Sequence, residues 1–269
     1  MITIIFAPPR YGKTALMSHI LNTYMYDYER TKMMQNAIAE LNSQGYNFDI
    51  PDNCVSANYD INGYKFMYSP KKNRRINPFR LGYANDNVDV HVNMPYEVIG
   101  IQEAQKYLNS RRSANFPDWQ SRWYEQDGHI GLDIFMDTQR PSLIDVNVRE
   151  LAKFIEVVKM TVKKDGYGRV CKVVWQVREF DNNGLLERYL ESGKRNKELY
   201  TARRIVADYD VFSIYDTHNC KDKFYKGHVN HKFKTEDNLE DNMPENFYKK
   251  LDSNKKEKKV AWLVIESLI

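Results

Sequence analysis

The sequence has no long hydrophobic run and very little cysteine. No stretch of about 18 consecutive apolar residues occurs in its 269 residues, so no membrane-spanning helix is predicted. Its three cysteines, Cys54, Cys171 and Cys220, are odd in number and far apart, which argues against a disulfide framework and favours a cytoplasmic, reducing compartment. With 12 glycines, 9 prolines and no short repeat, the chain is neither collagen-like nor a coiled coil.

The charge balance is only mildly basic. Forty Lys and Arg residues against 36 Asp and Glu residues give a net charge of +4, which permits contact with nucleic acid or an anionic membrane but does not demand it. Hydrophobic residues make up 42% of the chain, enough to build a substantial core. The first residues lack the basic start of a signal peptide and are typical of a β-strand.

The order of elements predicts an α/β fold of three layers. A β-branched strand at 1–6 leads into a loop and then a helix from Thr14, and later segments alternate between strand and helix patterns. Two β-branched runs around Asp165–Gly168 predict a hairpin, so antiparallel additions are expected at one sheet edge. The other expected elements are helices at 31–41 and 143–154, strands at 54–57, 98–101 and 130–136, and a hairpin turn at Asn62–Gly63.

Two regions are expected along the chain. Residues 1–220 form the α/β domain, and residues 221–269 form a polar, lysine-rich segment with a short apolar end. His218, Cys220, His228 and His231 are close enough to suggest zinc, but their spacing matches no standard site, so surface residues are the favoured interpretation. One interpretation of the aromatic residues in the second region is that they stack on single-stranded DNA. The favoured interpretation is that they pack a small C-terminal element.

The strongest motif follows the first strand. Ala7–Thr14 has the spacing of a phosphate-binding loop, with Ala7 in place of the first glycine, and it lies between a strand and a helix. In such loops the backbone N–H groups hold phosphate oxygens, the lysine reaches the β- and γ-phosphates, and the hydroxyl binds Mg²⁺. A chance Gly-Lys-Thr in a surface turn is the weaker alternative. The predicted ATP-binding residues are Pro8, Pro9, Arg10, Tyr11, Gly12, Lys13, Thr14 and Ala15.

The strand at 98–101 ends in Gln102 and Glu103, where many phosphate-loop enzymes carry Asp-Glu. Glu103 is the predicted catalytic base that polarises the attacking water. Gln102 then occupies the position of the magnesium-shell carboxylate, and we predict it as a metal-site residue together with Thr14, although an amide brings no negative charge. The alternative is that Glu103 only favours a helix N-terminus through the helix dipole.

Three segments together resemble the zonular occludens toxin (Zot)-like family. Glu103–Tyr107 followed by Ser110–Arg111 is similar to its Asp-Glu-Ala-Gln, aromatic, Ser-Arg signature, and Thr138–Asp145 to its Thr-Gln-x-Pro-Ser-x-Ile-Asp segment. Tyr215–Thr217 resembles the end of its ATPase domain, so the resemblance covers about residues 1–217. It implies an additional-strand catalytic-Glu P-loop NTPase fold of the RecA/FtsK-like kind, with MgATP as cofactor, in virion assembly or DNA export.

The resemblance also suggests residues that act on the γ-phosphate. Thr138 and Gln139 follow the strand expected beside the phosphate-loop strand, so Gln139 is predicted to orient water, while Thr138 either joins it or caps the next helix. Arg149 matches the family's arginine and is the predicted finger that completes a neighbour's site in a homo-oligomeric ring. Arg111, Arg112 and Arg140 are further candidates, and a solvated surface role is the default for each.

The sequence therefore predicts an ATPase that drives viral DNA packaging, virion assembly or DNA export in the host cytoplasm. DNA and capsid or other phage assembly proteins are the expected partners, with basic loops at 71–75 and 194–197 as candidate DNA contacts. Gln102 favours an alternative, a catalytically weak ATP-binding adaptor that organises an assembly on a capsid or membrane. A plain nucleic-acid-binding protein is the third interpretation.

Overall fold

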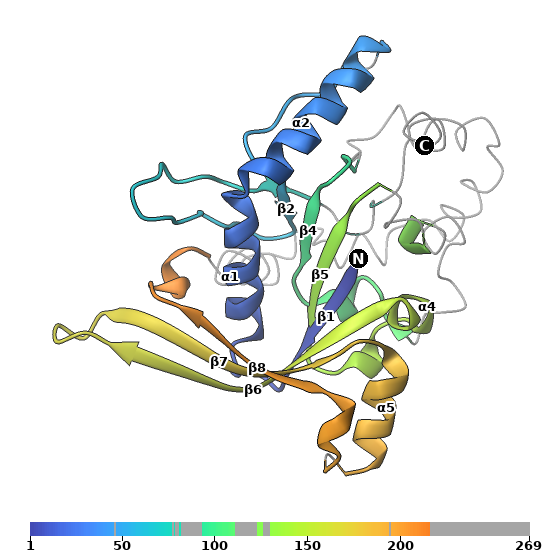
Figure 1. Ribbon diagram of the computed structural model, residues 1–269, viewed down its shortest axis with the longest axis vertical. Coiled ribbons are helices and arrows are strands. Elements are labelled where there is room, and N and C mark those ends of the chain that lie inside the picture. The colour runs from blue at the N-terminus through green and yellow to red at the C-terminus, as the bar shows by residue number, and fades with distance from the viewer. Residues whose placement is uncertain are drawn as a thin grey trace, which may run out of the picture.

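The computed structural model describes residues 1–45, 47–76, 78, 81, 93–110, 123–125, 130–193 and 195–215. In these residues eight strands form one sheet in the order β3-β2-β4-β5-β1-β6-β7-β8, shown in Figure 1. The first six of that order pair in parallel, and β7 and β8 add antiparallel strands. The strands are β1 (Ile2–Phe6), β2 (Val55–Ala57), β3 (Arg74–Arg75), β4 (Val98–Ile101), β5 (Asp133–Thr138), β6 (Ala152–Lys164), β7 (Val170–Phe180) and β8 (Thr201–Ala207).

Helices cover both faces of the sheet. The α-helices are α1 (Lys13–Met25), α2 (Tyr28–Ser43), α4 (Val146–Glu150) and α5 (Asn183–Glu191), and the short 3-10 helices are η2 (Ala104–Lys106), η4 (Pro141–Leu143), η5 (Lys197–Leu199) and η6 (Val211–Ser213). In Figure 1, α1 lies on one side of β1 and β5, and α4 and α5 lie on the other. The predicted three-layer α/β class with antiparallel edge additions is confirmed.

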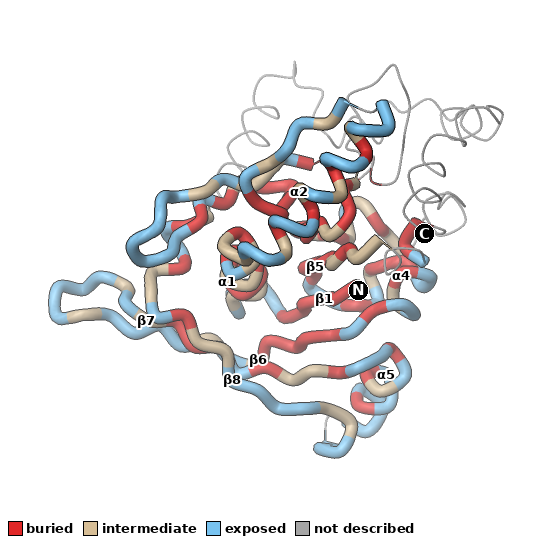
Figure 2. The backbone as a smooth tube through the Cα atoms, turned by 45° about the horizontal axis from the view of Figure 1, so that its top comes forward, coloured by how far each residue is buried: buried red, intermediate tan, exposed pale blue. Residues whose placement is uncertain are grey.

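The central strand β1 explains the two cores. All five of its residues are buried, as expected for a parallel strand covered on both faces. Because successive side chains point to opposite faces, Ile5 joins the cluster beneath α1 and α2, while Ile2 and Ile4 join the cluster beneath α4 and α5. Figure 2 shows that the buried residues gather in the sheet and that the exposed residues lie at its periphery.

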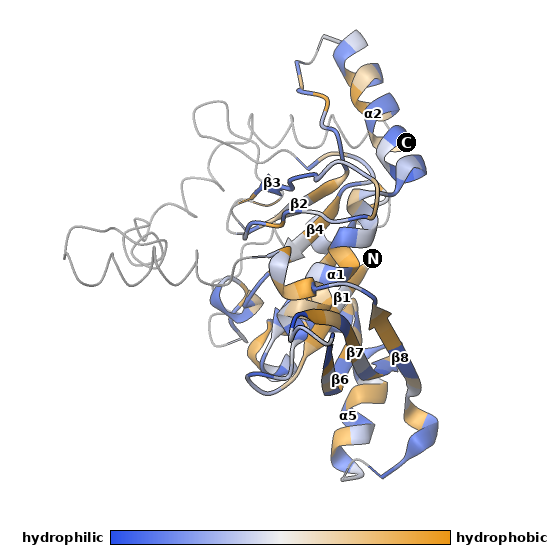
Figure 3. Cartoon of the chain, turned by 90° about the vertical axis from the view of Figure 1, so that its left-hand side faces the viewer, coloured by the Kyte–Doolittle hydropathy of each residue, from blue (hydrophilic) through white to orange (hydrophobic). Residues whose placement is uncertain are grey.

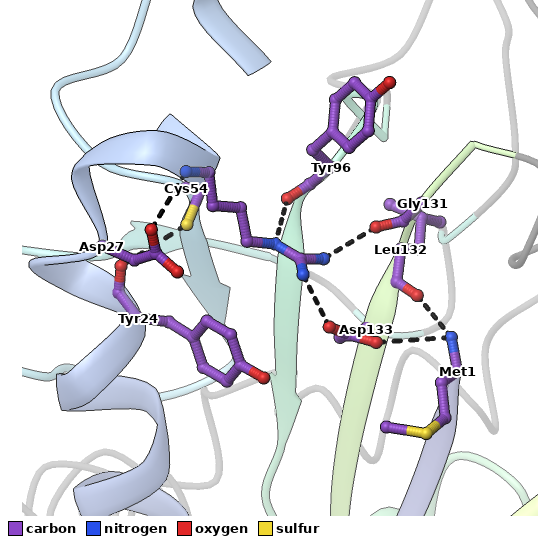
Figure 4. A network of polar contacts seen from close by, with 9 residues as sticks. Met1, Tyr24, Asp27, Cys54, Tyr96, Gly131, Leu132 and Asp133 are labelled. Atoms are coloured by element: carbon purple, nitrogen blue, oxygen red, sulfur yellow. Dashed lines mark hydrogen bonds and ion pairs between the residues drawn. The ribbon is translucent and has the colours of Figure 1, made fainter. Parts of the chain in front are cut away.

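The second helix is amphipathic, and polar contacts of Arg30 attach it to the sheet. Its buried residues recur at helical spacing. In Figure 3, hydrophobic and hydrophilic bands alternate along α2. Arg30 of α2 donates from Nε to the Tyr96 carbonyl at 2.8 Å and from Nη1 to Asp133 at 2.7 Å. Asp133 also lies 3.5 Å from the Met1 amino group, so one network (Figure 4) ties α2 to the beginnings of β1 and β5. At the opposite end of these strands, their carboxyl ends are followed by loops.

The predicted hairpin around Asp165–Gly168 is confirmed as β6 and β7. β6 begins parallel to β1 and then continues past it as an antiparallel ribbon with β7, which projects from the domain in Figure 1. Tyr167 at its tip is 87% exposed, whereas Met160 and Trp175, nearer its base, pack against the core. The ribbon base therefore lies close enough to support the loop after β1.

Two sequence predictions are wrong. The helix expected at 143–154 ends at Glu150. Ala152 and Phe154 belong to β6 instead, because they pair with β1 and bury their side chains in the cluster beneath α4 and α5. The hairpin turn expected at Asn62–Gly63 is instead part of a longer loop, in which Asn62 bridges to Lys72. The strand before it, β2, pairs in parallel with β3 and β4 rather than in a hairpin. In both places sheet partners distant in sequence override the local pattern.

Several predictions lie outside the described residues. These concern the C-terminal segment 221–269, the possible zinc ligands His218, Cys220, His228 and His231, and the arginines Arg111 and Arg112. Within the described residues, no helix is long and apolar enough to cross a membrane. The described part also contains no cluster of three or more His, Cys, Asp or Glu residues that could hold a metal ion.

Candidate nucleotide-binding site

Three predicted segments meet at one edge of the sheet. The phosphate-loop sequence follows β1, Glu103 follows β4, and Thr138 ends β5. β5 lies between β1 and β4 and pairs in parallel with both, so the carboxyl ends of all three strands point the same way. In open α/β sheets this edge is where ligands bind. The strand between the loop strand and the Glu103 strand is the additional strand that the resemblance implied.

The loop after β1 turns tightly into α1. Tyr11 N–H donates to the Pro8 carbonyl at 3.4 Å, and Arg10 and Gly12 both have left-handed backbones, with φ of 70° and 79°. Gly12 precedes α1, and no side chain of the described residues caps the helix start. The first N–H groups of a helix have no acceptor within the helix, and the helix dipole favours anions there. The loop is therefore built to receive an anion.

The ribbon of β6 and β7 supports this loop from behind. A Cβ on Gly12 would lie 2.1 Å from Sδ of Met160, and Trp175 donates its indole N–H to the Gly12 carbonyl at 3.2 Å. Trp175 in turn stacks on His19 of α1 at a ring-centroid distance of 5.5 Å, and burial lowers the pKa of His19. Only glycine combines this backbone conformation with so close an approach.

Asp137 of β5 is the group that the sequence analysis missed. Its side chain is fully buried, and Oδ2 accepts the Thr14 hydroxyl at 2.6 Å. Oδ1 accepts the Glu103 backbone N–H, also at 2.6 Å. Asp137 therefore connects the phosphate loop to the segment after β4. The available signal was an acidic residue inside the apolar strand Ile134–Thr138, where an unpaired charge is costly to bury.

The pKa of Asp137 reflects these contacts. Burial raises the pKa of this carboxyl, while the hydrogen bonds from Thr14 and Glu103 and the positive charge of Lys13 oppose the rise. Lys13 and Thr14 are the first residues of α1, and both are partly exposed. The site thus combines a positive group and a hydroxyl in the first turn of α1 with a buried acid on β5.

Glu103 adopts an uncommon backbone conformation. Its φ of 52° and ψ of 49° are left-handed, which a residue other than glycine adopts at an energetic cost and which concentrates at functional sites. The hydrogen bond from its N–H to Asp137 holds that conformation. Its side chain is 43% exposed and pairs with Lys106 at 2.7 Å, so the carboxylate faces solvent at the same sheet edge.

Gln102 lies beside the site, and its predicted place in the magnesium shell stays a prediction. Its backbone is held by Asn58, which lies just after β2, through bonds of 2.7 and 3.0 Å. Its side-chain oxygen Oε1 is buried, has no hydrogen-bond partner among the described residues, and so makes no bond to Thr14. The chain turns into η2 directly after β4, and Asn58 fixes that turn from the neighbouring strand. The structure brings Asp137, and not Gln102, to the Thr14 hydroxyl.

The other predicted residues lie at different distances from the loop. Thr138 is buried, its carbonyl accepts from Ala7 N–H at 3.4 Å, and its hydroxyl donates to the Arg140 carbonyl at 3.2 Å, so it does not cap a helix N–H group. Gln139 and Arg140 are exposed at the same edge. Arg149 donates to the Ile144 carbonyl at 3.1 Å and lies 3.8 Å from Glu187.

Arg149 belongs to the other end of the sheet. It sits in α4, just before β6, whose first residue Ala152 pairs with Ile2 at the start of β1. The phosphate loop follows Phe6 at the end of that same strand. Within one chain, therefore, Arg149 does not reach the loop, and a catalytic role requires that it act on a neighbouring chain.

The residues present fit a nucleotide phosphate chain with a divalent cation. Uncapped N–H groups and Lys13 suit phosphate oxygens, and the Thr14 hydroxyl, oriented by a buried carboxylate, suits a hard cation that takes oxygen ligands. Such a cation is typically held by few protein atoms plus phosphate oxygens and water. A cluster of several acidic ligands is not needed for it.

Comparisons with known proteins find distant similarity to solved structures. No family model and no curated protein matches the chain. The N-terminal domain of zonular occludens toxin from Neisseria meningitidis is similar, at 18% identity and a TM-score of 0.42, over 80% of this chain and 98% of that one. B204, the DNA-packaging ATPase of Sulfolobus Turreted Icosahedral Virus, is similar at 13% identity and a TM-score of 0.34, over 68% and 93%. The genome packaging NTPase B204 of Sulfolobus turreted icosahedral virus 2 with sulfate shows 10% identity and a TM-score of 0.37, over 76% and 94%.

Proposed function

We propose that this chain is a magnesium-dependent ATPase that powers viral DNA packaging, virion assembly or DNA export as an oligomeric ring. The observation that carries the ATPase proposal is the convergence of an uncapped glycine loop, Thr14 with its carboxylate partner, and Glu103 at the carboxyl ends of adjacent parallel strands. The viral role rests on the motif resemblance of residues 1–217. The host cytoplasm is the proposed location.

Each residue has a definite task in this proposal. The loop N–H groups and Lys13 bind the phosphates, and Glu103 accepts a proton from the attacking water while Gln139 helps to orient that water. A bound magnesium ion neutralises charge on the phosphates. Glu103 must leave Lys106 to act, but an exposed ion pair is worth only about 0–1 kcal/mol, so little opposes the exchange.

The proposal is tested by titrating the full chain with ATP and Mg²⁺ and by measuring phosphate release with and without DNA. Binding together with turnover supports the ATPase. Binding without turnover, even with DNA and at high protein concentration, supports the alternative adaptor that organises an assembly on a capsid or membrane. Absence of binding overturns both.

Ring formation gives a prediction of its own. If Arg149 completes the site of a neighbouring chain, specific ATPase activity should rise with protein concentration, because single chains lack the arginine. Arg149→Ala should lower turnover and leave ATP affinity largely intact, and mixing it with Glu103→Gln chains should restore part of the activity. Thermal unfolding is the control, since Arg149 also contacts Glu187 in its own chain. Activity that is independent of concentration, with no rescue on mixing, contradicts the trans role.

Two of the candidate DNA-contact residues in the loop at 71–75 already have ion-pair partners in the chain. Arg74 pairs with the buried Glu97, and Arg75 lies 3.4 Å from Asp60, so both guanidinium groups have partners within the chain. Lys71 forms no ion pair with a carboxylate among the described residues, and its Nζ lies 5.6 Å from the centre of the Tyr26 ring. In the second loop, Lys194 is outside the described residues, and Arg195 and Lys197 are exposed.

Exposed aromatic residues accompany Lys71. Phe66 is 75% exposed and Tyr68 is 61% exposed, and Nζ of the neighbouring Lys65 lies 4.5 Å from the Tyr68 ring centre. Proteins that hold single strands without sequence preference combine cationic side chains with rings on which bases stack. The surface formed by Tyr64–Tyr68 and Lys71 therefore supports the proposal that the chain contacts DNA.

Replacing Lys65 and Lys71 with alanine should flatten the salt dependence of DNA binding. Each phosphate contact to a single strand contributes about 0.7 to the slope of log affinity against log salt, so the slope should fall by about 1.4. Fluorescence anisotropy with a labelled oligonucleotide at several salt concentrations measures it. Lys153→Ala with Lys172→Ala is the matched control, because both lysines are already paired with carboxylates. An unchanged slope in the Lys65 and Lys71 variant contradicts this contact.

A further inference from the structure

A buried carboxylate with no cation in contact needs an explanation. Asp137 is fully buried, and among the described residues no Lys, Arg or His nitrogen forms an ion pair with it, although the positive charge of Lys13 acts on it from farther away. Its two oxygens instead accept hydrogen bonds from the Thr14 hydroxyl and the Glu103 N–H, each at 2.6 Å. Burying a charge without a counter-charge is costly, and hydrogen bonds offset only part of that cost. The position is suited to a cation that arrives with a ligand.

The two partners of Asp137 define where such a cation would lie. Because Thr14 donates its only hydroxyl proton to Asp137, the lone pairs of its oxygen remain free for a cation on the side of the phosphate loop. The second partner, Glu103, is the predicted catalytic base, and its left-handed backbone is fixed by the same carboxylate. One side chain therefore orients both the metal ligand and the segment that carries the base.

We propose that Asp137 on β5 is the positioning carboxylate of the divalent-cation site and supplies the negative charge that Gln102, after β4, does not. The proposal rests on the proposed nucleotide-binding function. Asp137 acts through the Thr14 hydroxyl and through its own charge, which makes cation binding more favourable close to the phosphates. The acidic residue of the metal site then lies on β5, next to β4, which explains how an amide is tolerated at position 102.

The test separates metal binding from nucleotide binding in Asp137→Asn, which keeps the size of the side chain. Electron paramagnetic resonance with Mn²⁺ and a non-hydrolysable ATP analogue measures cation affinity in the complex. We expect Asp137→Asn to weaken Mn²⁺ binding about 10–100-fold, the usual effect of losing an outer-shell partner. In EDTA, the affinity for the same analogue should be unchanged or higher, because a negative charge near the phosphates has been removed. Simple misfolding would lower both affinities.

Two comparison variants complete the test. Asp133→Asn makes the same change at the other end of β5, outside the site, and is expected to leave Mn²⁺ affinity unchanged in the nucleotide complex. Gln102→Ala tests the proposal independently, in case Asp137→Asn does not fold. It should change Mn²⁺ affinity less than about threefold, whereas a loss of tenfold or more returns the role to Gln102 and overturns the proposal.

The remaining outcomes are also decisive. A wild-type chain that binds no nucleotide overturns the proposed function and this inference with it. Intact nucleotide binding with unchanged Mn²⁺ affinity in Asp137→Asn overturns the inference alone. Equal losses with Mn²⁺ and in EDTA show that Asp137 only holds β5 to the loop, and they too overturn it.

Discussion

Replacing Lys13 with alanine is expected to abolish ATP binding in the micromolar range. Lys13 is the first residue of α1, directly after the left-handed Gly12, and it is the cationic side chain that the phosphate-loop spacing aims at the phosphates. Hydrogen bonds to charged groups contribute about 1.5–3 kcal/mol each, so losing the ammonium contacts should weaken binding by about 100-fold or more. Isothermal titration calorimetry with Mg²⁺ present measures the change.

The fold should survive that substitution. Lys13 forms no ion pair with a carboxylate among the described residues, and alanine suits a helix. Asp137 loses the distant positive charge of Lys13 but keeps its hydrogen bonds from Thr14 and the Glu103 N–H. Lys32→Ala, an exposed lysine of α2, is the matched control and should bind ATP as the wild type does. If a folded Lys13→Ala chain keeps wild-type affinity, then the loop after β1 is not a phosphate site.

Replacing Glu103 with glutamine is expected to keep ATP binding and to lower turnover by about 100-fold or more, the scale of losing a general base. The amide has nearly the same shape, but it cannot accept a proton from water. The hydrogen bond that holds this segment to Asp137 comes from the Glu103 backbone, so it persists in the variant. The variant should therefore separate chemistry from folding of the site.

Phosphate release and calorimetric ATP affinity, measured on the same preparation, test this expectation. Glu191→Gln, an exposed change on α5, controls for the loss of one negative charge and should hydrolyse ATP normally. Retained turnover in Glu103→Gln would remove Glu103 from the catalytic role. If Glu103→Gln loses both binding and turnover, then the residue supports the loop rather than the reaction.

Much of the fold was predictable from local sequence. The β-branched run at 1–6, the glycine loop and the helix after it identify the central strand, the tight loop that follows it and α1. The turn at Asp165–Gly168 between two β-branched runs identifies the long hairpin. These signals lie within a few residues of one another, so neighbouring side chains and backbone preferences decide them without the rest of the molecule.

What the tertiary structure decided depends on strands far apart in the chain. Ala152 and Phe154 became a strand because β1 lies beside them, although their sequence continues a helical pattern. Gln102 was predicted as a metal-site residue from its place in a motif, and Asn58 fixes its backbone. Asp137, on the strand between β1 and β4, accepts a hydrogen bond from Thr14, which lies 123 positions away in the sequence. Sequence spacing fixes which residues follow each strand. Which of their side chains meet is set by the order in which the strands pair, because neighbours in a parallel sheet are distant in the chain.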